Sequence, residues 1–466
     1  MQYVTGIDVA ARIAEGDVSV SEVTAQALER AAADTHGAFA HLTADAAMHR
    51  AMLLDERMAE PGFVPGPLYG VPVPIKDLTM VYGAPCSFGS AALDDFEPTG
   101  DDGVVQRLHR AGTVSIGKTS TPEFGLPCYT EPEGAPPAVT PWDPTRMAGG
   151  SSGGAAVAVA SGIVPIAHGN DGGGSIRIPA ACCGVVGMKP SRGLVSWGPL
   201  GNDGPGLAAH GVLARTIADV AAALEAMRGN VPGDVFWDVS GPLSEALMQP
   251  TRELRIGVSV EPFICADADV HPEAITAVEN SMGRLAKLGH RVSPAAAPFP
   301  PEAWDVFRPI WAMGAAQIPV PEDREHLLRP LTRWLREQGR RVSGMEYAEA
   351  LTALDQLRRR IATAWEDFDI IVTPTLAQPP LPVGALRDDA DPAADFEAQT
   401  RFTPWTSVLN ITGSPAISLP LHHAEVGGSR LPFGVQVVGR VGDDASVLQL
   451  GRDLMGGVSV GAVPPP

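Results

Sequence analysis

The chain has 466 residues, of which 45% are hydrophobic and 19% charged, and its formal net charge is −20 at pH 7. This composition is typical of a globular protein, and the length is sufficient for a large core. The excess of acidic residues repels polyphosphate, which argues against nucleic acid as a partner.

The cysteines and the N-terminus indicate a cytoplasmic location. The number of cysteines is odd, and neither a C-x-x-C pair nor a His/Cys ligand spacing links them; they are Cys86, Cys128, Cys182, Cys183 and Cys265. This pattern argues against both a disulfide framework and a zinc site, and it fits a reducing compartment. The first residues have no basic start and no unbroken apolar run, so we expect no signal peptide.

The first part of the chain predicts helices followed by a strand. Residues 5–60 have a helical pattern, with capping-box spacing that begins at Ser19. Residues 68–81 alternate like a strand, and the prolines within them favour a sheet edge or a strand end. This alternation puts Lys76 and Asp77 on opposite faces, so the two side chains need not pair.

The central part has a long segment without charge. We predict a short helix over 103–111, a strand over 113–117 and a long loop over 121–145. Residues 147–170 contain no Lys, Arg, Asp or Glu, as a membrane span would, but they include six glycines and Pro165. Because the apolar runs are short, we predict a buried helix and strand and no membrane partner.

The remaining elements alternate in type. The sequence predicts, in order, a helix that begins at Thr216, a linker at 229–234, a strand over 254–260, helices over 273–288 and 301–340, a helix that begins at Ser343, a strand over 369–375, two strands within 410–439 and a frayed tail at 461–466. Alternating strands and helices favour an α/β fold, with a central twisted mixed β-sheet covered by helices on both faces.

We expect a single domain. It comprises N-terminal helices (1–60), a core (61–230), a mostly helical insertion that borders the substrate pocket (231–365), and C-terminal strands and a helix that return to the sheet (366–466).

The stretch 147–177 contains two serines between glycines, Ser151 and Ser175. A serine acts as a nucleophile only if a base takes its proton and donors receive the charge on the substrate oxygen. The glycines before Ser175 let the backbone approach a substrate closely. Lys76 lies in an apolar, proline-stiffened strand, where burial lowers a lysine pKa toward that of a useful base. Taken singly, these features also fit glycine-rich turns and a solvated lysine.

Taken together, the motifs resemble the amidase signature family of serine hydrolases over nearly the whole chain. The stretches that carry the resemblance are GVPVPIKD (70–77), GKTSTPEFG (117–125), PWDPTRMAGGSSGG (141–154), AHGNDGGGSIRIPAACCGVVGMKPSRG (167–193), ARTIAD (214–219), DIIVTPT (369–375) and NITGSPAISLP (410–420). Their order and wording are very specific. The wording is most similar to actinobacterial amidases and to the branch that holds the hydrolase of cyclic nylon oligomers.

The resemblance implies a fold, a reaction and a set of residues. It implies the amidase signature fold and hydrolysis of a small-molecule amide to an acid plus ammonia or an amine, without a metal or cofactor, and it is compatible with a homodimer. The implied residues are the nucleophile Ser175, the bridging cis-serine Ser151, the base Lys76, the oxyanion-hole N–H groups of Gly172, Gly173 and Gly174, and the supporting residues Asp171, Arg177 and Ser152.

The chain departs from the family pattern in two places. Gly172 stands where many relatives have Thr or Ile, which leaves the N–H donor in place. The loop YTEPEGAPPAVTPWD (129–143) lacks the common T-x-N-P wording, so the substrate preference is the property in question. In the aromatic-rich middle, Trp311 and Met313 are candidates for lining the acyl pocket, although helix packing in a core is the favoured explanation for either one.

Other interpretations remain at this point. Residues 150–154 also fit a G-x-S-x-G elbow with Ser152 as the nucleophile and His210, His271 or His326 as its base, although no strand precedes them. Residues 115–118 match S-x-x-K without its companion motifs, so a strand end with an exposed Lys118 is the better interpretation. The glutamine-hydrolysing subunit of a tRNA-dependent amidotransferase and a non-catalytic binding protein share the implied fold.

Overall fold

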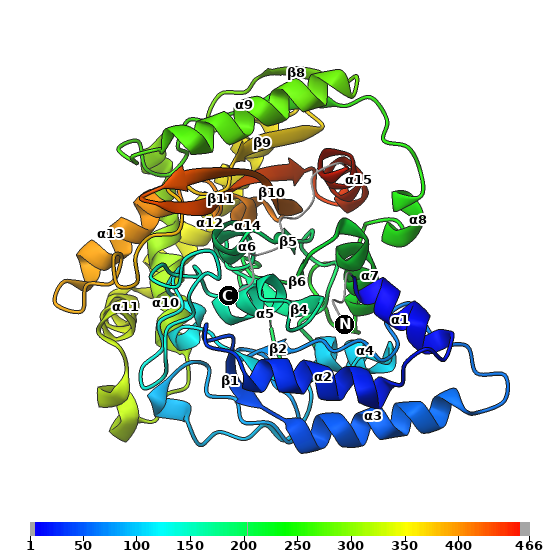
Figure 1. Ribbon diagram of the computed structural model, residues 1–466. Coiled ribbons are helices and arrows are strands. Elements are labelled where there is room, and N and C mark those ends of the chain that lie inside the picture. The colour runs from blue at the N-terminus through cyan, green and yellow to red at the C-terminus, as the bar shows by residue number, and fades with distance from the viewer. Residues whose placement is uncertain (1–4, 203, 457–466) are drawn as a thin grey trace.

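An eight-stranded mixed β-sheet runs through the computed structural model, which describes residues 5–202 and 204–456 (Figure 1). Its strands lie in the order β4 (Ile166–Asp171), β6 (Ala209–Ala214), β5 (Val186–Lys189), β10 (Ala416–Val426), β11 (Ser429–Gly439), β9 (Ile370–Pro374), β7 (Arg255–Val258) and β8 (Arg291–Pro294). Neighbours from β4 to β9 are antiparallel, whereas β9, β7 and β8 are parallel. The chain therefore has the predicted α/β class with a mixed sheet.

A smaller sheet lies beside the first. It has the order β1 (Phe39–Leu42), β3 (Gly117–Thr119) and β2 (Ile75–Lys76), with β2 parallel to β3. The strand β2 is at the edge, where proline-flanked strands are tolerated because a missing N–H breaks no ladder there. The side chains of Lys76 and Asp77 have different partners, Ser151 and Lys118, and do not pair with each other, which agrees with the prediction that they need not pair.

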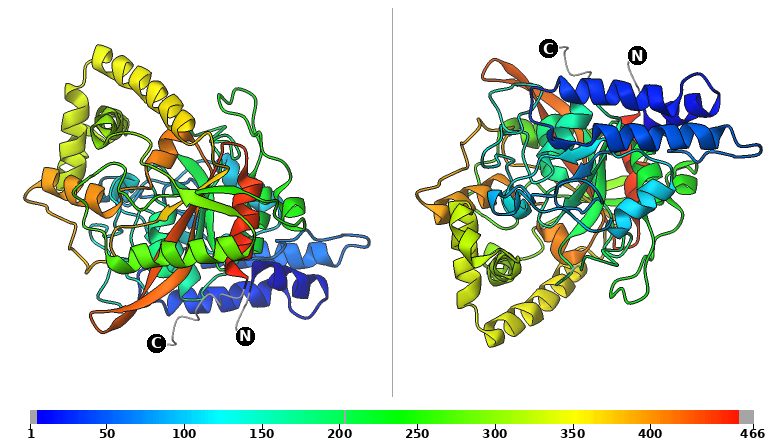
Figure 2. Two further views of the ribbon diagram at one scale, coloured as in Figure 1. Left: turned by 90° about the horizontal axis from the view of Figure 1, so that it is seen from above. Right: turned by 90° about the horizontal axis from the view of Figure 1, so that it is seen from below.

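Helices cover both faces of the large sheet. The α-helices are α1 (Gly6–Ala14), α2 (Val20–Ala32), α3 (Ala44–Met58), α4 (Gly103–Arg110), α5 (Gly153–Ala160), α6 (Arg177–Cys183), α7 (Ile217–Met227), α8 (Leu243–Leu247), α9 (Pro272–Lys287), α10 (Phe307–Gln317), α11 (Pro330–Arg341), α12 (Gly344–Ala364), α13 (Pro392–Phe402), α14 (Val408–Thr412) and α15 (Asp444–Met455). The 3₁₀ helices are η1 (Ala91–Leu93), η2 (Glu123–Gly125), η3 (Pro301–Val306) and η4 (Glu322–Leu327). In Figure 1, β11 lies between α9 and α6 and contacts both. Figure 2 shows α10 to α13 grouped at one side of the molecule, away from α1 to α3.

Several helix starts confirm the capping signals in the sequence. Ser19 and Ser343 form capping boxes at the starts of α2 and α12, and Thr216 caps α7. The helix α5 is buried along its whole length, which its small residues permit. No helix within the described residues combines the length and apolar character that a membrane span requires.

The predictions are wrong at three places in the fold. The helical region 5–60 also contains β1, and the strand predicted over 68–81 is regular only over Ile75–Lys76. In the segment 231–365, the strand β7 lies within the strand predicted over 254–260, but the strand β8, which also joins the large sheet, was not predicted. The tail predicted at 461–466 lies outside the described residues.

Candidate active site

Three segments bring the predicted triad residues to one place. The edge strand β2 carries Lys76, the turn before α5 carries Ser151, and the loop between β4 and α6 carries Ser175. The peptide bond between Gly150 and Ser151 is cis, which is the form that the family resemblance implies for the bridging serine. Ser151 and Ser175 line the same cavity, and both are buried.

Lys76 is fully buried at the base of this site. Its Nζ lies 2.7 Å from Ser151 Oγ, 2.7 Å from Asn170 Oδ1 and 3.3 Å from the Asn170 carbonyl oxygen. Burial lowers the pKa of Lys76 well below its ordinary value, and the charge of Asp171 opposes that shift only in part. The amine is thus held toward its neutral form, which is the form able to accept a proton from a hydroxyl.

The two serines of the cis-peptide turn have different partners. Ser151 Oγ faces Lys76, whereas the Ser152 amide N–H donates to the Ser175 carbonyl oxygen at 3.0 Å. Ser152 Oγ donates to the Asn170 carbonyl oxygen at 3.2 Å. Within the described residues, Ser151 Oγ and Ser175 Oγ make no hydrogen bond to each other. Such bonds commonly tighten only when substrate is bound.

The amides around Ser175 differ in their availability. Gly174 N–H, one of the three expected oxyanion-hole donors, donates to Asp171 Oδ1 at 2.8 Å, so this amide already has a protein acceptor in this structure. In residues 5–202 and 204–456, the amides of Gly172, Gly173 and Ser175 donate to no protein acceptor. Gly174 has φ +130°, and a Cβ there would lie 2.4 Å from Thr406 Oγ1, so only glycine fits this position.

A buried ion pair supports the Ser175 loop. Arg177 binds Asp171 through Nη2 and Nε at 2.8 and 2.9 Å, and this contact holds the pKa of the carboxyl group below its usual range. Arg177 also donates to the Gln436 side chain at 2.8 Å. Asn410 donates to Asp171 Oδ1 at 2.9 Å, and Thr406 Oγ1 donates to the Gly173 carbonyl oxygen at 2.8 Å. These contacts attach the loop to the C-terminal part of the chain.

Four of these residues were missing from the sequence-based site. Asn170, Thr406, Asn410 and Gln436 bind either Lys76 or the loop that carries Ser175. Asn170 and Asn410 lie inside two of the family motifs, at 167–193 and 410–420, and this position was the sequence signal that could have marked them as site residues. Thr406 and Gln436 lie more than 200 positions from their partners, and no local pattern marks them.

A pair of buried histidines lies behind the lysine. The Lys76 amide N–H donates to His168 Nδ1 at 3.4 Å, and His168 Nε2 lies 3.1 Å from His210 Nδ1. Burial lowers the pKa of His168 well below its ordinary value and lowers the pKa of His210 to about 3. Both rings are therefore neutral. His210 makes no hydrogen bond to Ser152 among the described residues, because Ser152 Oγ donates to the Asn170 carbonyl oxygen.

The two competing motif interpretations do not fit the structure. His271 caps α9 and His326 lies in η4, so neither bonds to Ser152, which is buried behind the site. For residues 115–118, the preferred interpretation of an exposed Lys118 is wrong, because Lys118 is fully buried. Its Nζ lies 2.8 Å from Asp77 Oδ1, so its partner is Asp77 and not Ser115, as the S-x-x-K motif would require. The sequence did not reveal this pairing because Asp77 lies 41 residues earlier.

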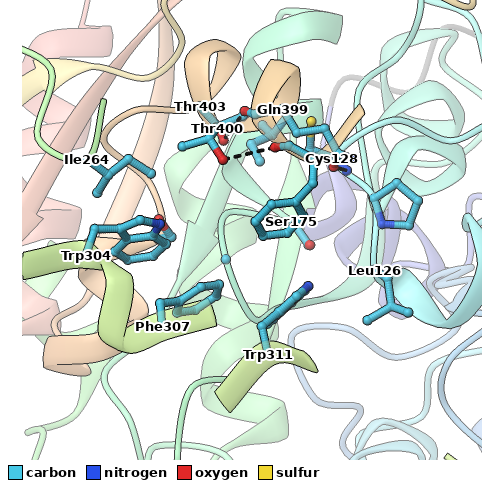
Figure 3. A pocket seen from close by; sticks show the side chains of 15 residues that line it. Leu126, Cys128, Ser175, Ile264, Trp304, Phe307, Trp311, Gln399, Thr400 and Thr403 are labelled. Atoms are coloured by element: carbon cyan, nitrogen blue, oxygen red, sulfur yellow. Dashed lines mark hydrogen bonds between the residues drawn. The ribbon is translucent and has the colours of Figure 1, made fainter. Parts of the chain in front are cut away.

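Two cavities meet at Ser175. The larger has a volume of about 550 Å³, is lined mainly by apolar residues and includes Ser151 and Asn170. The narrower, of about 70 Å³, lies between aromatic side chains and Gln399, Thr400 and Thr403 (Figure 3). Of the two candidate pocket residues, Trp311 lines both cavities, whereas Met313 lines neither. None of the described lining residues carries a charge.

Comparison with known proteins identifies the family. The family model described as Amidase matches residues 22–448, so the chain belongs to the amidase family and is a hydrolase of carbon–nitrogen bonds other than peptide bonds. In the described residues, no group of three or more His, Cys, Asp or Glu side chains is arranged to hold a metal ion.

Three relatives illustrate the range of the family. A putative amidase of Synechocystis sp. is 35% identical over 97% of this chain and 88% of its own length. The 6-aminohexanoate-cyclic-dimer hydrolase of Paenarthrobacter ureafaciens is 33% identical over 87% and 86%, and a solved structure of an enzyme with that name has a TM-score of 0.89 over 98% and 97%. A glutamyl-tRNA(Gln) amidotransferase subunit of Chloroflexus aurantiacus is also 33% identical, over 97% and 96%.

Proposed function

We propose that this amidase hydrolyses a small-molecule carboxylic amide through an acyl-enzyme on Ser175, with Ser151 and Lys76 as the proton relay. The observation that carries the proposal is the position of Lys76 Nζ, which is buried 2.7 Å from Ser151 Oγ. Among the described residues it has no carboxylate partner. A lysine without a counter-charge in the protein interior favours its neutral form, which is the form a general base needs.

The proposed reaction has two halves. Ser175 Oγ attacks the carbonyl carbon while its proton passes to Ser151 and the Ser151 proton passes to Lys76. The amides of Gly172, Gly173 and Ser175 receive the charge that develops on the carbonyl oxygen. Cleavage of the C–N bond returns the proton through Ser151 to the leaving nitrogen. Water then cleaves the Ser175 ester by the same relay and releases the carboxylic acid, and no step draws on a metal or cofactor.

The supporting residues act on geometry. Asp171 and Arg177 fix the loop that carries the nucleophile, and the Ser152 amide fixes the Ser175 carbonyl oxygen. We assign these residues to positioning, because none of them lines either of the two cavities at Ser175.

The runner-up function is glutamine hydrolysis within a tRNA-dependent amidotransferase. Glutamine carries an α-ammonium and an α-carboxylate, and such groups bind tightly when opposite charges face them. None of the described residues that line the two cavities is charged, which favours neutral amides cleaved without partner subunits. A cytoplasmic location is supported by the five cysteines, all of them buried and free of disulfides. A homodimer is compatible with this proposal.

The test is covalent labelling with a fluorophosphonate, followed by mass-spectrometric mapping of the modified peptide. We expect a label on Ser175 that Ser175→Ala abolishes and Ser152→Ala retains. A label on Ser152 would favour the elbow mechanism instead. No label, together with no hydrolysis of small amides, would favour a binding protein, and hydrolysis of glutamine only with added partner subunits would favour the amidotransferase.

A further inference from the structure

Ser175 lies at the junction of the two cavities, and they differ in more than size. The large cavity includes Ser151 together with Ser175, whereas the narrow cavity includes Ser175 and Gly173 without Ser151. The site is therefore asymmetric about the bond that would be cleaved.

This asymmetry gives the substrate a direction. In the proposed reaction Ser151 hands a proton to the leaving nitrogen, and a proton donor must be within hydrogen-bond reach of the atom it protonates. The nitrogen and its substituent must then lie on the side of Ser151, in the large cavity. The acyl substituent, on the other side of the carbonyl carbon, then lies in the narrow cavity.

The narrow cavity has stiff walls. Trp304 and Phe307 stack with ring centroids 4.2 Å apart, and Phe307 and Trp311 stack at 5.2 Å, so each ring holds the next (Figure 3). On the facing side, Thr400 and Thr403 direct their hydroxyl groups to backbone carbonyl oxygens. The volume of about 70 Å³ thus has little room to grow, and it suits an acyl chain of a few carbons.

One polar atom indicates that the narrow cavity receives a ligand. Ser407 lines it, and Ser407 Oγ is buried with no hydrogen-bond partner among the described residues. Buried polar groups are normally paired, so an unpaired hydroxyl beside the nucleophile indicates a partner that arrives with substrate or water.

We propose that the preferred substrates are neutral secondary amides that join a short acyl group to a bulky apolar amine. The proposal rests on the acyl-enzyme function proposed above and adds the substrate class and its orientation. The large cavity takes the amine substituent against side chains such as Leu207, Ile310 and Ile318, and the narrow cavity takes the acyl group.

Two isomeric amides test the orientation directly. N-Hexylacetamide and N-ethylhexanamide have the same atoms, and both release an alkylamine, but they exchange the long and short groups about the carbonyl. One buried methylene is worth roughly fourfold in affinity. We expect kcat/KM for N-hexylacetamide to exceed that for N-ethylhexanamide at least tenfold, and any smaller ratio overturns the proposal.

A glycine on α10 allows the large cavity to be filled without disturbing the core. Gly314 lines this cavity, and an added Cβ there meets no atom within 4 Å. We expect Gly314→Phe to lower kcat/KM for N-hexylacetamide at least tenfold. The matched control is Gly283→Phe, a helical glycine on α9 with equally open surroundings and remote from both cavities. It should leave both rates unchanged.

The outcomes separate the orientation from the chemistry. If Gly314→Phe slows N-ethylhexanamide more than its isomer, the acyl chain lies in the large cavity and the proposal is overturned. If Ser175 takes the fluorophosphonate label but neither isomer is cleaved, the substrate class is wrong while acyl transfer stands. If Ser175 takes no label and no amide is cleaved, the proposed function itself fails.

Discussion

The strands β2 and β3 lie side by side, and each carries a fully buried lysine, yet the two lysines have opposite surroundings. Lys118 Nζ lies 2.8 Å from the carboxylate of Asp77. Lys76 Nζ lies at 2.7 Å from a hydroxyl and from an amide oxygen, and in the described residues it has no such partner. The comparison teaches that the partner, and not the depth, decides whether a buried lysine stays charged in an ion pair or becomes available to accept a proton.

The largest expected effect is the loss of the unpaired amine. Lys76→Met keeps an unbranched side chain of similar length and removes the proposed base. We expect kcat to fall by roughly 10⁴-fold, the scale seen when one member of a catalytic unit is removed, while the circular dichroism spectrum stays native. A fall in kcat of less than about tenfold would contradict the role of Lys76 as the base.

The same substitution on the neighbouring strand should act on stability instead. Lys118→Met leaves the Asp77 carboxylate buried without its counter-charge, which costs about 3–5 kcal/mol of unfolding free energy. Urea unfolding measures this loss. Lys118→Met combined with Asp77→Asn should recover part of it, because no charge remains buried. A single variant as stable as the wild type would show that the pair contributes nothing.

A third change should make Lys76 resemble Lys118. Asn170→Asp places a carboxylate beside Lys76 Nζ, where Asn170 Oδ1 now lies at 2.7 Å. An adjacent negative charge raises a lysine pKa, and the neutral amine is the proposed base. The acidic limb of the kcat/KM profile should therefore move up by at least about one pH unit.

In this variant, activity lost at neutral pH should return at alkaline pH. Asn170→Ala is the control, because it removes the hydrogen bond without adding charge. If Asn170→Asp lowers kcat/KM equally at every pH and does not move the acidic limb of the profile, Lys76 is not the titrating base.

The smallest expected effect is on stability as pH changes. The folded-state pKa of Lys76 lies below its unfolded value of about 10.4, so between the two values the unfolded chain binds more protons. Stability from this group therefore rises with pH through that window, by at most about 1.4 kcal/mol per pH unit. The unfolding free energy of the wild type minus that of Lys76→Met should rise accordingly in urea titrations. A difference independent of pH would contradict the lowered pKa.

The sequence predicted correctly those residues whose position is set by a short motif or by neighbours a few positions away. Ser175, Ser151 and Lys76 lie in specific motifs, and the structure brings all three to one cavity system. The capping signals at Ser19 and Ser343 also gave correct helix starts, because a cap involves only residues three positions apart.

What the sequence did not reveal depends on distant partners. The burial of Lys118 requires Asp77, and the support of Arg177 requires Gln436, 259 positions later. The commitment of the Gly174 amide to Asp171 depends on the exact loop path, which the glycine run does not specify. The strand β8 has only four residues and pairs only with β7, at the edge of the large sheet. Its alternation of apolar and polar residues is too short to predict a strand, and its conformation depends on tertiary packing.

The C-terminal hairpin of β10 and β11 occupies the centre of the large sheet, between β5 and β9. Arg177 reaches Gln436 on this hairpin across 259 positions of sequence. A ribosome that adds roughly 5–20 residues per second needs about 13–50 s for that distance. During this interval the nascent chain already contains both serines and the lysine but not Gln436, which binds Arg177 beside the Ser175 loop. A site that depends on Gln436 can form only after the hairpin has been synthesised, so we expect a fragment that ends before Ser429 to be inactive.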